Sequence, residues 1–293
     1  MPENAIMNRY EFVLLYDVTN GNPNGDPDAG NMPRIDPETG HGLVTDVCIK
    51  RKIRNYVEMT REDEPGYGIY IKQDIPLQTT QNAGIEAVKS VQGKAEKSAS
   101  FRDYMCGRYF DIRTFGAVMA GAVGNKELMN TAGQVRGPVQ LAFGRSIDPI
   151  VPQEIAITRV AIETEKKAEN ASTEMGRKHI VPYGLYRQEG FISANLAQRI
   201  TGFSDADLSL LWEAINGMFE FDRSAARGLM VLRGLYVFKH ESAFGNAPAH
   251  KLFDLISVAR KQGVVVPRAF TDYTVFIDAS SLPEGVTLED LTL

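Results

Sequence analysis

The alternation of apolar and polar positions along the chain predicts a protein built from both strands and helices. Residues 8–17 are dense in aromatic and branched side chains, which is typical of a buried first strand. Residues 43–60 repeat apolar positions at helical spacing, and their apolar stripe runs through Ile49 and Ile53. Thr45 stands where an N-cap residue would begin this helix.

The same patterns continue through the rest of the chain and define the order of its elements. Ser204 followed by Asp207 is a capping-box start for one later helix. Together the patterns predict helices over 101–120, 204–219 and 248–261, and strands over 136–147, 155–164, 179–194, 230–238 and 271–280. The order strand, helix, strands, helix, strand predicts an α+β fold whose antiparallel sheet follows the βαββαβ plan of ferredoxin-like and RRM-like domains.

Two segments interrupt this plan within what we expect to be a single domain spanning residues 1–293. Residues 61–100 are polar and mixed, with one strand-like piece at 68–72, and we interpret them as an insertion. Residues 150–195 predict a second insertion, a long β-hairpin with an exposed polar tip over 164–178.

Residues 19–42 form a long stretch rich in Gly, Pro, Asn and Asp, which favours turns over regular structure. Loops of this length are usually functional or disordered. Asn20, Asn22 and Asn24 alternate within it, and their amides and the neighbouring backbone are candidate ligand contacts.

Two metal-binding interpretations of this loop, and a plain turn-forming role, stay open at this stage. A calcium loop of the EF-hand type is disfavoured because prolines interrupt the alternation and no Glu closes it at the twelfth position. A magnesium-dependent nuclease would need Asp26, Asp28 and Asp36 to converge near His41, which spacing alone does not show.

One face of the 43–60 helix carries Lys50, Arg51 and Arg54 beside the apolar stripe, with Lys52 on the opposite flank. Such a face is often only solvated. Its position after the first strand and the glycine-rich loop favours phosphate binding, and we expect the cationic heads to reach outward.

Three further places could contact a strand of nucleic acid. Arg113 and Thr114 could seat a phosphate, although Arg113 could equally pair with Asp111. The predicted hairpin tip and the turn after the 204–219 helix add further candidates, where an exposed methionine could wedge between bases and two arginines could share one surface. These candidates are Met175, Arg177, Lys178, Arg223 and Arg227.

Composition narrows the functional classes. The chain is 43% hydrophobic, enough for a buried core, and contains no apolar run long enough for a membrane span and no secretory signal pattern. Two cysteines outside any CxxC pair, Cys48 and Cys106, indicate a reducing, cytoplasmic location. The net charge of −5 restricts any phosphate-binding surface to a local groove.

Established catalytic patterns are missing from the sequence. It lacks a P-loop, a GxGxxG turn, a GxSxG elbow and an HExxH helix, and its four histidines are isolated. We therefore expect no catalytic residue, no metal and no cofactor.

Five segments together resemble one protein family. Residues 16–34, YDVTNGNPNGDPDAGNMPR, resemble the N-terminal signature of the backbone subunits of type I-C and I-B CRISPR complexes, members of the RAMP superfamily. Residues 43–57, 111–119, 137–146 and 221–230 resemble that family's later motifs, in the same order. The resemblance therefore spans essentially the whole chain and is closest to the subunit of the type I-C Cascade complex.

The resemblance implies an RRM-like palm, inserted fingers and a hairpin thumb. It implies a non-catalytic subunit that forms a helical filament along a CRISPR guide RNA and presents it for pairing with target DNA in antiviral defence. Its implied partners are the guide RNA, target DNA, other copies of itself, other Cascade subunits and a recruited helicase-nuclease, with no membrane. A sheet with aromatic and basic surroundings would suit single-stranded RNA.

Two other functions remain open on the residues. Related type III subunits cleave RNA with a loop aspartate, so Asp26 or Asp28 could serve a divalent-metal RNase. A calcium or small-ligand module built on residues 19–42 is the second alternative.

Overall fold

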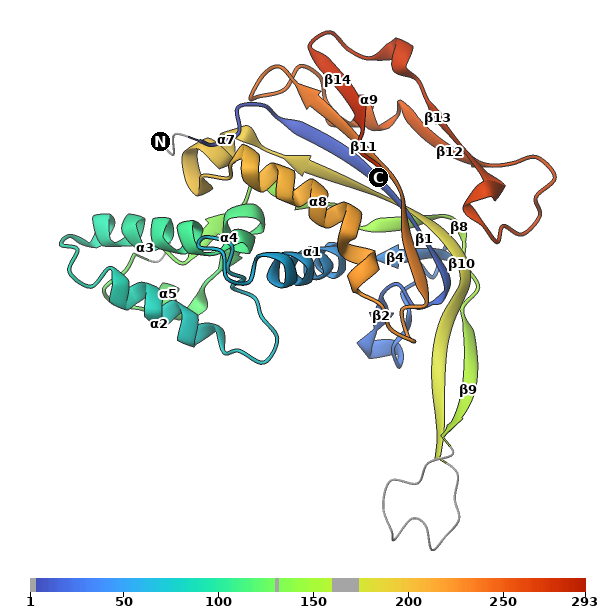
Figure 1. Ribbon diagram of the computed structural model, residues 1–293, viewed down its shortest axis with the longest axis horizontal. Helices are drawn as coiled ribbons and strands as arrows, with labels where there is room; N and C mark the ends of the chain where they lie inside the picture. Colours follow the sequence, from blue (N-terminus) through green and yellow to red (C-terminus); the bar gives the residue numbers. More distant parts are fainter. Residues whose placement is uncertain (1–3, 130–131, 160–173) are drawn as a thin grey trace, which may run out of the picture.

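The computed structural model describes residues 4–129, 132–159 and 174–293, and a central antiparallel sheet organises them (Figure 1). The strand order is β14-β11-β1-β10-β8-β4, and β7 (Val139–Leu141) also pairs with β10. The strands of the main path are β1 Tyr10–Gly21, β4 His41–Val44, β8 Gly144–Pro149, β10 Glu174–Ile192, β11 Leu229–His240 and β14 Val286–Asp290.

Strand β1 is buried on both faces of the sheet, as its nearly continuous apolar run predicts. Phe12 and Leu14 belong to the main hydrophobic cluster, which also contains the helices. Val13 and Leu15 point to the other face and pack in a second cluster with the C-terminal segment. The sheet is therefore the middle layer of three.

Helices α1 (Asp46–Arg61) and α8 (Asp205–Phe221) cover one face of the sheet (Figure 1). Both predicted helices are confirmed, and Thr45 is the N-cap residue of α1. Ser204 and Asp207 form the predicted capping box of α8. Fully burying each apolar side chain of these stripes contributes about 1.5–3 kcal/mol, which fixes the helices on the sheet.

The C-terminal segment covers the opposite face (Figure 1). The predicted helix over 248–261 is wrong after Phe253, because α9 (Ala249–Phe253) gives way to strand β12 (Ile256–Arg260). β12 pairs with β13 (Tyr273–Ile277) in a separate hairpin, and β14 was not predicted. Side chains of this layer cover one face of the sheet and those of α1 and α8 cover the other.

A helical unit with its own hydrophobic cluster projects from the sheet. It contains α2 Leu77–Ala87, α3 Lys94–Arg108, α4 Phe110–Phe115, β5 Gly116–Val118, α5 Ala120–Val123 and β6 Gln134–Arg136. Its buried cluster runs from Tyr70 through Phe101 to Val135. Residues 68–72 form no strand beyond one isolated bridge at Gly68, and 136–147 divides among three short strands.

A long hairpin extends away from the sheet, where β9 (Gln153–Arg159) pairs with the first part of β10 (Figure 1). The predicted tip extended too far into the return arm, because residues 174–178 already belong to β10. The rest of that predicted tip lies outside the described residues. Among the described residues, none of the helices combines the length and apolar character needed to cross a bilayer.

Candidate nucleic-acid interface

Three segments far apart in sequence meet where β1 ends. The Asn22 amide donates to the Ala226 carbonyl at 2.8 Å, and the Cys48 thiol donates to the Pro23 carbonyl at 3.5 Å. We call this place the loop junction, formed by residues 19–24, 45–52 and 222–228. It brings together candidates from three of the motifs recognised in the sequence.

Glycine makes the crossing of two of these segments possible. A Cβ on Gly21 would lie 1.9 Å from the Arg227 carbonyl oxygen, and a Cβ on Gly228 would lie 2.5 Å from that of Asn20. Gly228 also has a φ of +62°, which favours glycine. The two backbones therefore touch directly, and their neighbouring side chains share one surface.

The three candidate asparagines have different environments. Asn20 is exposed and adopts a φ of 50°. Asn22 is buried and donates to the Asn31 carbonyl at 2.7 Å, while its Oδ1 has no hydrogen-bond partner in the described chain. Asn24 accepts from the Thr45 backbone amide at 2.9 Å and hydroxyl at 3.0 Å, so this pair ties the loop to α1.

A shared carboxylate organises the cations of the junction. Asp222 pairs with the buried Lys52 ammonium and, at 3.1 Å, with Arg227. Burial lowers the pKa of Lys52, while Asp222 acts in the opposite direction. Arg227 remains about one-third exposed. The Arg227 guanidinium is therefore held in position and accessible, and it shares the Asp222 carboxylate with Lys52.

Lys52 and Asp222 were missed as site residues by sequence reasoning. The helical wheel placed Lys52 on the far flank of α1, where α8 and the turn after it turn out to pack. The available signal was an aspartate at the start of the basic turn that contains Arg223 and Arg227.

The expected outward reach of the basic face of α1 is wrong for Lys50 and Arg54. Lys50 is largely buried and pairs with Asp46 at 2.9 Å, and Arg54 pairs with Asp111 at 2.9 Å. Both cations also lie over the Phe115 ring, at 5.6 and 5.2 Å. Helix α4 supplies Asp111 and Phe115, and it therefore covers the basic face that α1 would expose if it stood alone.

Arg51 lies beside these two cations on the same helix. Its guanidinium donates to the Ile71 carbonyl at 2.7 Å, and the side chain is partly exposed. It therefore braces α1 against the segment that leads into the helical unit.

Arg113 and Thr114 are structural in the described chain. The Arg113 guanidinium donates to both carboxylate oxygens of Asp207, at 2.9 and 2.6 Å, and to the Cys106 carbonyl at 2.7 Å. The alternative partner, Asp111, is instead bound to Arg54. Thr114 has no exposed surface. In this conformation the Arg113 guanidinium is therefore held by Asp207, and the Thr114 hydroxyl is buried.

The remaining candidates lie on the hairpin and on the turn after α8. Met175 is 74% exposed on the hairpin, and Arg177 pairs across it with Glu154 at 2.9 Å. Lys178 follows on the same strand and is partly buried. Arg223 pairs with Glu220 at 2.5 Å on the turn after α8. Arg223 lies in the loop junction, whereas the hairpin residues belong to a separate arm.

The acidic loop residues are engaged with neighbouring groups. Asp26 accepts from the Asp28 amide and lies 3.4 Å from Arg34. Asp36 accepts from Arg145 at 2.8 Å, and this hydrogen bond, together with those from the Glu38 amide and Thr39, lowers the pKa of Asp36 to about 2.

His41 is part of the same loop and bonds to backbone. Its Nδ1 lies 2.7 Å from the Ser146 carbonyl oxygen, on the neighbouring strand β8. Within residues 4–129, 132–159 and 174–293, no three His, Cys, Asp or Glu side chains gather as metal ligands would.

Known proteins with similar chains are CRISPR-associated. A protein of Haloferax volcanii named CRISPR-associated protein Cas7 is 27% identical over 231 residues, covering 71% of this chain and 64% of that protein. The chain thus spans less than two thirds of the length of this curated relative.

Solved structures with a partly similar fold come from CRISPR complexes. A chain of a CRISPR RNA-guided surveillance complex in a pre-nicking state has a TM-score of 0.49 at 14% identity, with 78% of each chain covered. A chain of a type III-B Cmr-beta complex bound to cognate target RNA has a TM-score of 0.43 at 11% identity, covering 78% of this chain and 61% of that one.

The family model described as CRISPR-associated protein Cas7 matches residues 8–278. That range contains β1, both sheet-covering helices, the helical unit, the hairpin and every part of the loop junction. The chain belongs to the Cas7 family of CRISPR-associated proteins.

Proposed function

We propose that this chain is a non-catalytic backbone subunit that holds a CRISPR guide RNA by its sugar–phosphate chain at the loop junction. The observation that carries the proposal is the convergence of residues 19–24, 45–52 and 222–228 on one surface. Exposed Asn20 and Arg223 and the positioned Arg227 lie there together, next to backbone that a ligand can approach closely. Such contacts bind phosphates and leave bases free to pair.

The finer assignment follows from the family resemblance and from the chain order of the elements. Strands β1, β8, β10 and β11 with helices α1 and α8 follow a βαββαβ plan, which we interpret as an RRM-like palm. The helical unit would be the fingers and the β9–β10 hairpin the thumb. We assign the subunit to a type I-C Cascade complex in the cytoplasm, stacked with its own copies and presenting the guide to target DNA, with a recruited helicase-nuclease cutting that DNA.

Purification with bound RNA tests the proposal directly. We expect the expressed protein to elute as a large species that carries RNA of uniform length. The variant Arg223→Gln with Arg227→Gln should lose this RNA, and the salt slope of its binding to single-stranded RNA should fall by about 1.4 if each lost contact contributes about 0.7. Lys251→Gln with Lys261→Gln changes charge equally on the exposed C-terminal layer and should retain the RNA.

A monomer that ignores single-stranded RNA even at low salt would contradict the proposal. Incubating the RNA-loaded protein with complementary RNA and magnesium separates a scaffold from an RNase. Regular cleavage that disappears with Asp26→Ala or Asp28→Ala would favour the enzyme.

A further inference from the structure

Helix α4 (Phe110–Phe115) lies in a motif for which the loop junction has no use. Residues 111–119 are one of the five segments that resemble the family, yet every side chain of α4 is buried. The helix nevertheless carries two charges of opposite sign, on Asp111 and Arg113. Because a buried charge is costly without a partner, the partners of these two residues show which parts of the chain α4 holds together.

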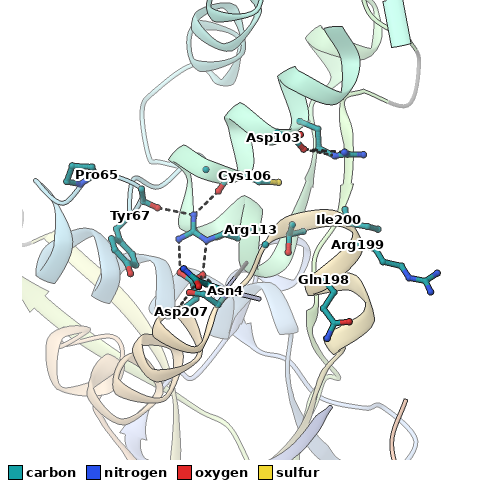
Figure 2. A pocket seen from close by; sticks show the side chains of 16 residues that line it. Asn4, Pro65, Tyr67, Asp103, Cys106, Arg113, Gln198, Arg199, Ile200 and Asp207 are labelled. Atoms are coloured by element: carbon teal, nitrogen blue, oxygen red, sulfur yellow. Dashed lines mark hydrogen bonds and ion pairs between the residues drawn. The ribbon is translucent and has the colours of Figure 1, made fainter. Parts of the chain in front are cut away.

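Arg113 anchors α4 on helix α8. Its guanidinium donates to both carboxylate oxygens of Asp207, at 2.9 and 2.6 Å, and to the carbonyl oxygens of Cys106 and Gly66, at 2.7 and 3.1 Å. Figure 2 shows this guanidinium between Asp207, at the start of α8, and Cys106 on α3. Asp207 is itself fixed by its capping box with Ser204. Helix α4 therefore has a fixed place relative to the start of α8.

Asp111 connects α4 to helix α1 and to the chain that follows it. The side chain is 1% exposed. Its Oδ2 accepts from the Arg54 Nε at 2.9 Å and from the Ile71 amide at 3.1 Å, and its Oδ1 accepts from the Tyr70 amide at 2.8 Å. One carboxylate therefore holds α1 and residues 70–71 in a fixed relation.

Ile71 extends this constraint to Arg51. The Ile71 amide bonds to Asp111, and the Ile71 carbonyl accepts from the Arg51 Nη1 at 2.7 Å. The Arg51 guanidinium is therefore restrained by a neutral carbonyl, which leaves its positive charge uncompensated. A guanidinium has several further N–H donors in the same plane, and these suit the oxygens of a phosphate.

Arg51 differs from the other cations in this part of α1. Lys50, Lys52 and Arg54 each pair with a carboxylate. Arg51 is partly exposed and, in the part of the chain that the structure describes, has no carboxylate within ion-pair distance. It also belongs to the 45–52 segment of the loop junction. Arg51 is therefore a restrained cation at the proposed RNA surface.

We propose that Asp111 is a positioning residue for RNA binding, which holds the Arg51 guanidinium, through the backbone of Ile71, where a phosphate of the strand at the loop junction meets it. The inference rests on the proposed function, because it assumes that strand. Arg113 contributes by keeping α4, and with it Asp111, in place.

Asp111 acts without touching the RNA. Its carboxylate is buried and has the same sign of charge as a phosphate, so direct contact would be repulsive. A guanidinium already held in its binding geometry loses less conformational entropy when a phosphate binds than a freely rotating one. Release of Ile71 from Asp111 therefore weakens the contact that Arg51 makes.

A double-mutant cycle on the full chain, freed of RNA from expression, tests this link with labelled single-stranded RNA. Arg51→Gln should weaken binding about tenfold, as expected for the loss of one hydrogen bond to a charged group. Its salt slope should fall by about 0.7. Asp111→Asn should reduce both affinity and slope in the same direction. Adding Asp111→Asn to Arg51→Gln should change the affinity by less than about twofold, because the group that Asp111 positions is already gone.

Two control variants separate positioning from a general loosening of the helical unit. Asp103→Asn makes the same chemical change at an exposed carboxylate of α3 and should keep affinity and slope. Phe101→Ala loosens the core of the helical unit and should also keep both. An equal loss in Phe101→Ala would show that Asp111 is merely structural and would overturn the proposal. Losses that add in the double variant, or an unchanged salt slope in Asp111→Asn, would overturn it as well.

Asp111→Asn leaves the buried Arg54 without its counter-ion, which can prevent folding. If that variant melts at a much lower temperature, Asp111→Asn combined with Arg54→Met leaves no stranded charge and takes its place in the cycle. The same coupling to Arg51→Gln is then expected, and additive losses again contradict the proposal.

The cycle also separates this inference from the proposed function. If Arg223→Gln with Arg227→Gln loses RNA while Arg51→Gln and Asp111→Asn bind as the unaltered chain does, the proposed function stands and the inference fails. If the arginine pair after α8 has no effect but the cycle shows coupling, the proposed place of the strand fails and the link between Asp111 and Arg51 stands.

Discussion

Lys52 illustrates how a single side chain takes its role from its surroundings. Its ammonium is nearly inaccessible and meets Asp222, while the Phe219 ring lies 5.7 Å away. Removing the carboxylate would leave a buried charge without a partner, which costs more than losing an exposed ion pair. Asp222 therefore serves both the stability of the α1–α8 contact and the orientation of Arg227.

We predict that Asp222→Asn lowers the free energy of unfolding by about 3 kcal/mol, measured by urea denaturation. Glu220→Gln is the matched control, because its partner Arg223 is exposed and the pair should contribute at most about 1 kcal/mol. Adding Lys52→Met to Asp222→Asn should restore part of the loss, since it removes the stranded charge. Equal costs for the two single variants would refute this role of Asp222.

A second residue-scale prediction concerns Asp36, which is partly buried and bonded to Arg145. Hydrogen bonding lowers the pKa of Asp36 from 3.8 to about 2. A lowered folded-state pKa means that the stabilising contribution is complete above the ordinary value and is lost as the pH falls through about 2. Carboxyl chemical shifts followed by NMR should show this low midpoint, and Arg145→Gln should move it upward. A midpoint near 3.8 in the unaltered protein would contradict the bond.

The burial of the basic face of α1 changes what a charge reversal on this face would measure. If both side-chain heads lay in solvent, reversal of Lys50 and Arg51 to Glu would leave the fold intact. With Lys50 paired to Asp46 and stacked on Phe115, a glutamate there would face a like charge. We now expect that double variant to lose stability as well as any RNA, so it cannot report on RNA binding alone.

At the scale of elements, the crossing of the β1 end with the turn after α8 determines the shape of the loop junction. The crossing depends on glycine at two positions where any side chain would meet backbone. The backbone conformation at Gly228 recurs at Gly30, where φ is +61° but nothing lies within 4 Å of an added Cβ. A substitution at Gly30 therefore tests the left-handed conformation alone, whereas one at Gly228 adds overlap with neighbouring backbone.

We predict that Gly30→Ala costs about 1–2 kcal/mol of stability through its left-handed conformation alone. Gly228→Ala should cost clearly more, because its Cβ would also overlap the Asn20 carbonyl oxygen and the Gly21 Cα. RNA retention should fall only in Gly228→Ala. Urea denaturation and the absorbance ratio of the purified protein measure the two effects, and similar results for both variants would argue against the crossing as a determinant of the site.

At the scale of the whole molecule, the chain has separate hydrophobic clusters in the sheet layers and in the helical unit. Separate clusters allow one part to open while the other stays folded. Two buried ion pairs connect the parts: Arg54–Asp111 links the helical unit to α1, and Arg113–Asp207 links it to α8. These buried pairs set how the helical unit is held on the sheet layers.

We predict that Phe101→Ala, in the centre of the helical unit, costs about 3–5 kcal/mol locally. Hydrogen exchange should accelerate over α2 and α3 while β1 and β11 keep their protection. Phe276→Ala is the matched control, because this phenylalanine is 62% exposed on β13 and should change little. Uniform acceleration across the sheet would instead indicate a single cooperative core.

The hydrophobic pattern alone was sufficient for the elements that form the sheet core. The apolar stripe of α1, the capping box of α8 and the apolar run of β1 depend on local spacing and local hydrogen bonds, so they are visible in the sequence. The same local rules failed at 248–261, where apolar residues fit both helix and strand. Pairing with β13, which begins at Tyr273 beyond an intervening loop, decided in favour of a strand.

The motifs by themselves determined the family resemblance and the list of polar candidates, because residue types and their order are properties of the chain. Only the tertiary structure decided which candidates remain accessible. Arg54 and Arg113 are buried against carboxylates of α4 and α8. Asp222 and Lys52 belong to the site although they were not among the predicted residues. The physical reason is that the partner of a charge is set by what folds against it, and this information lies tens to hundreds of residues away along the chain.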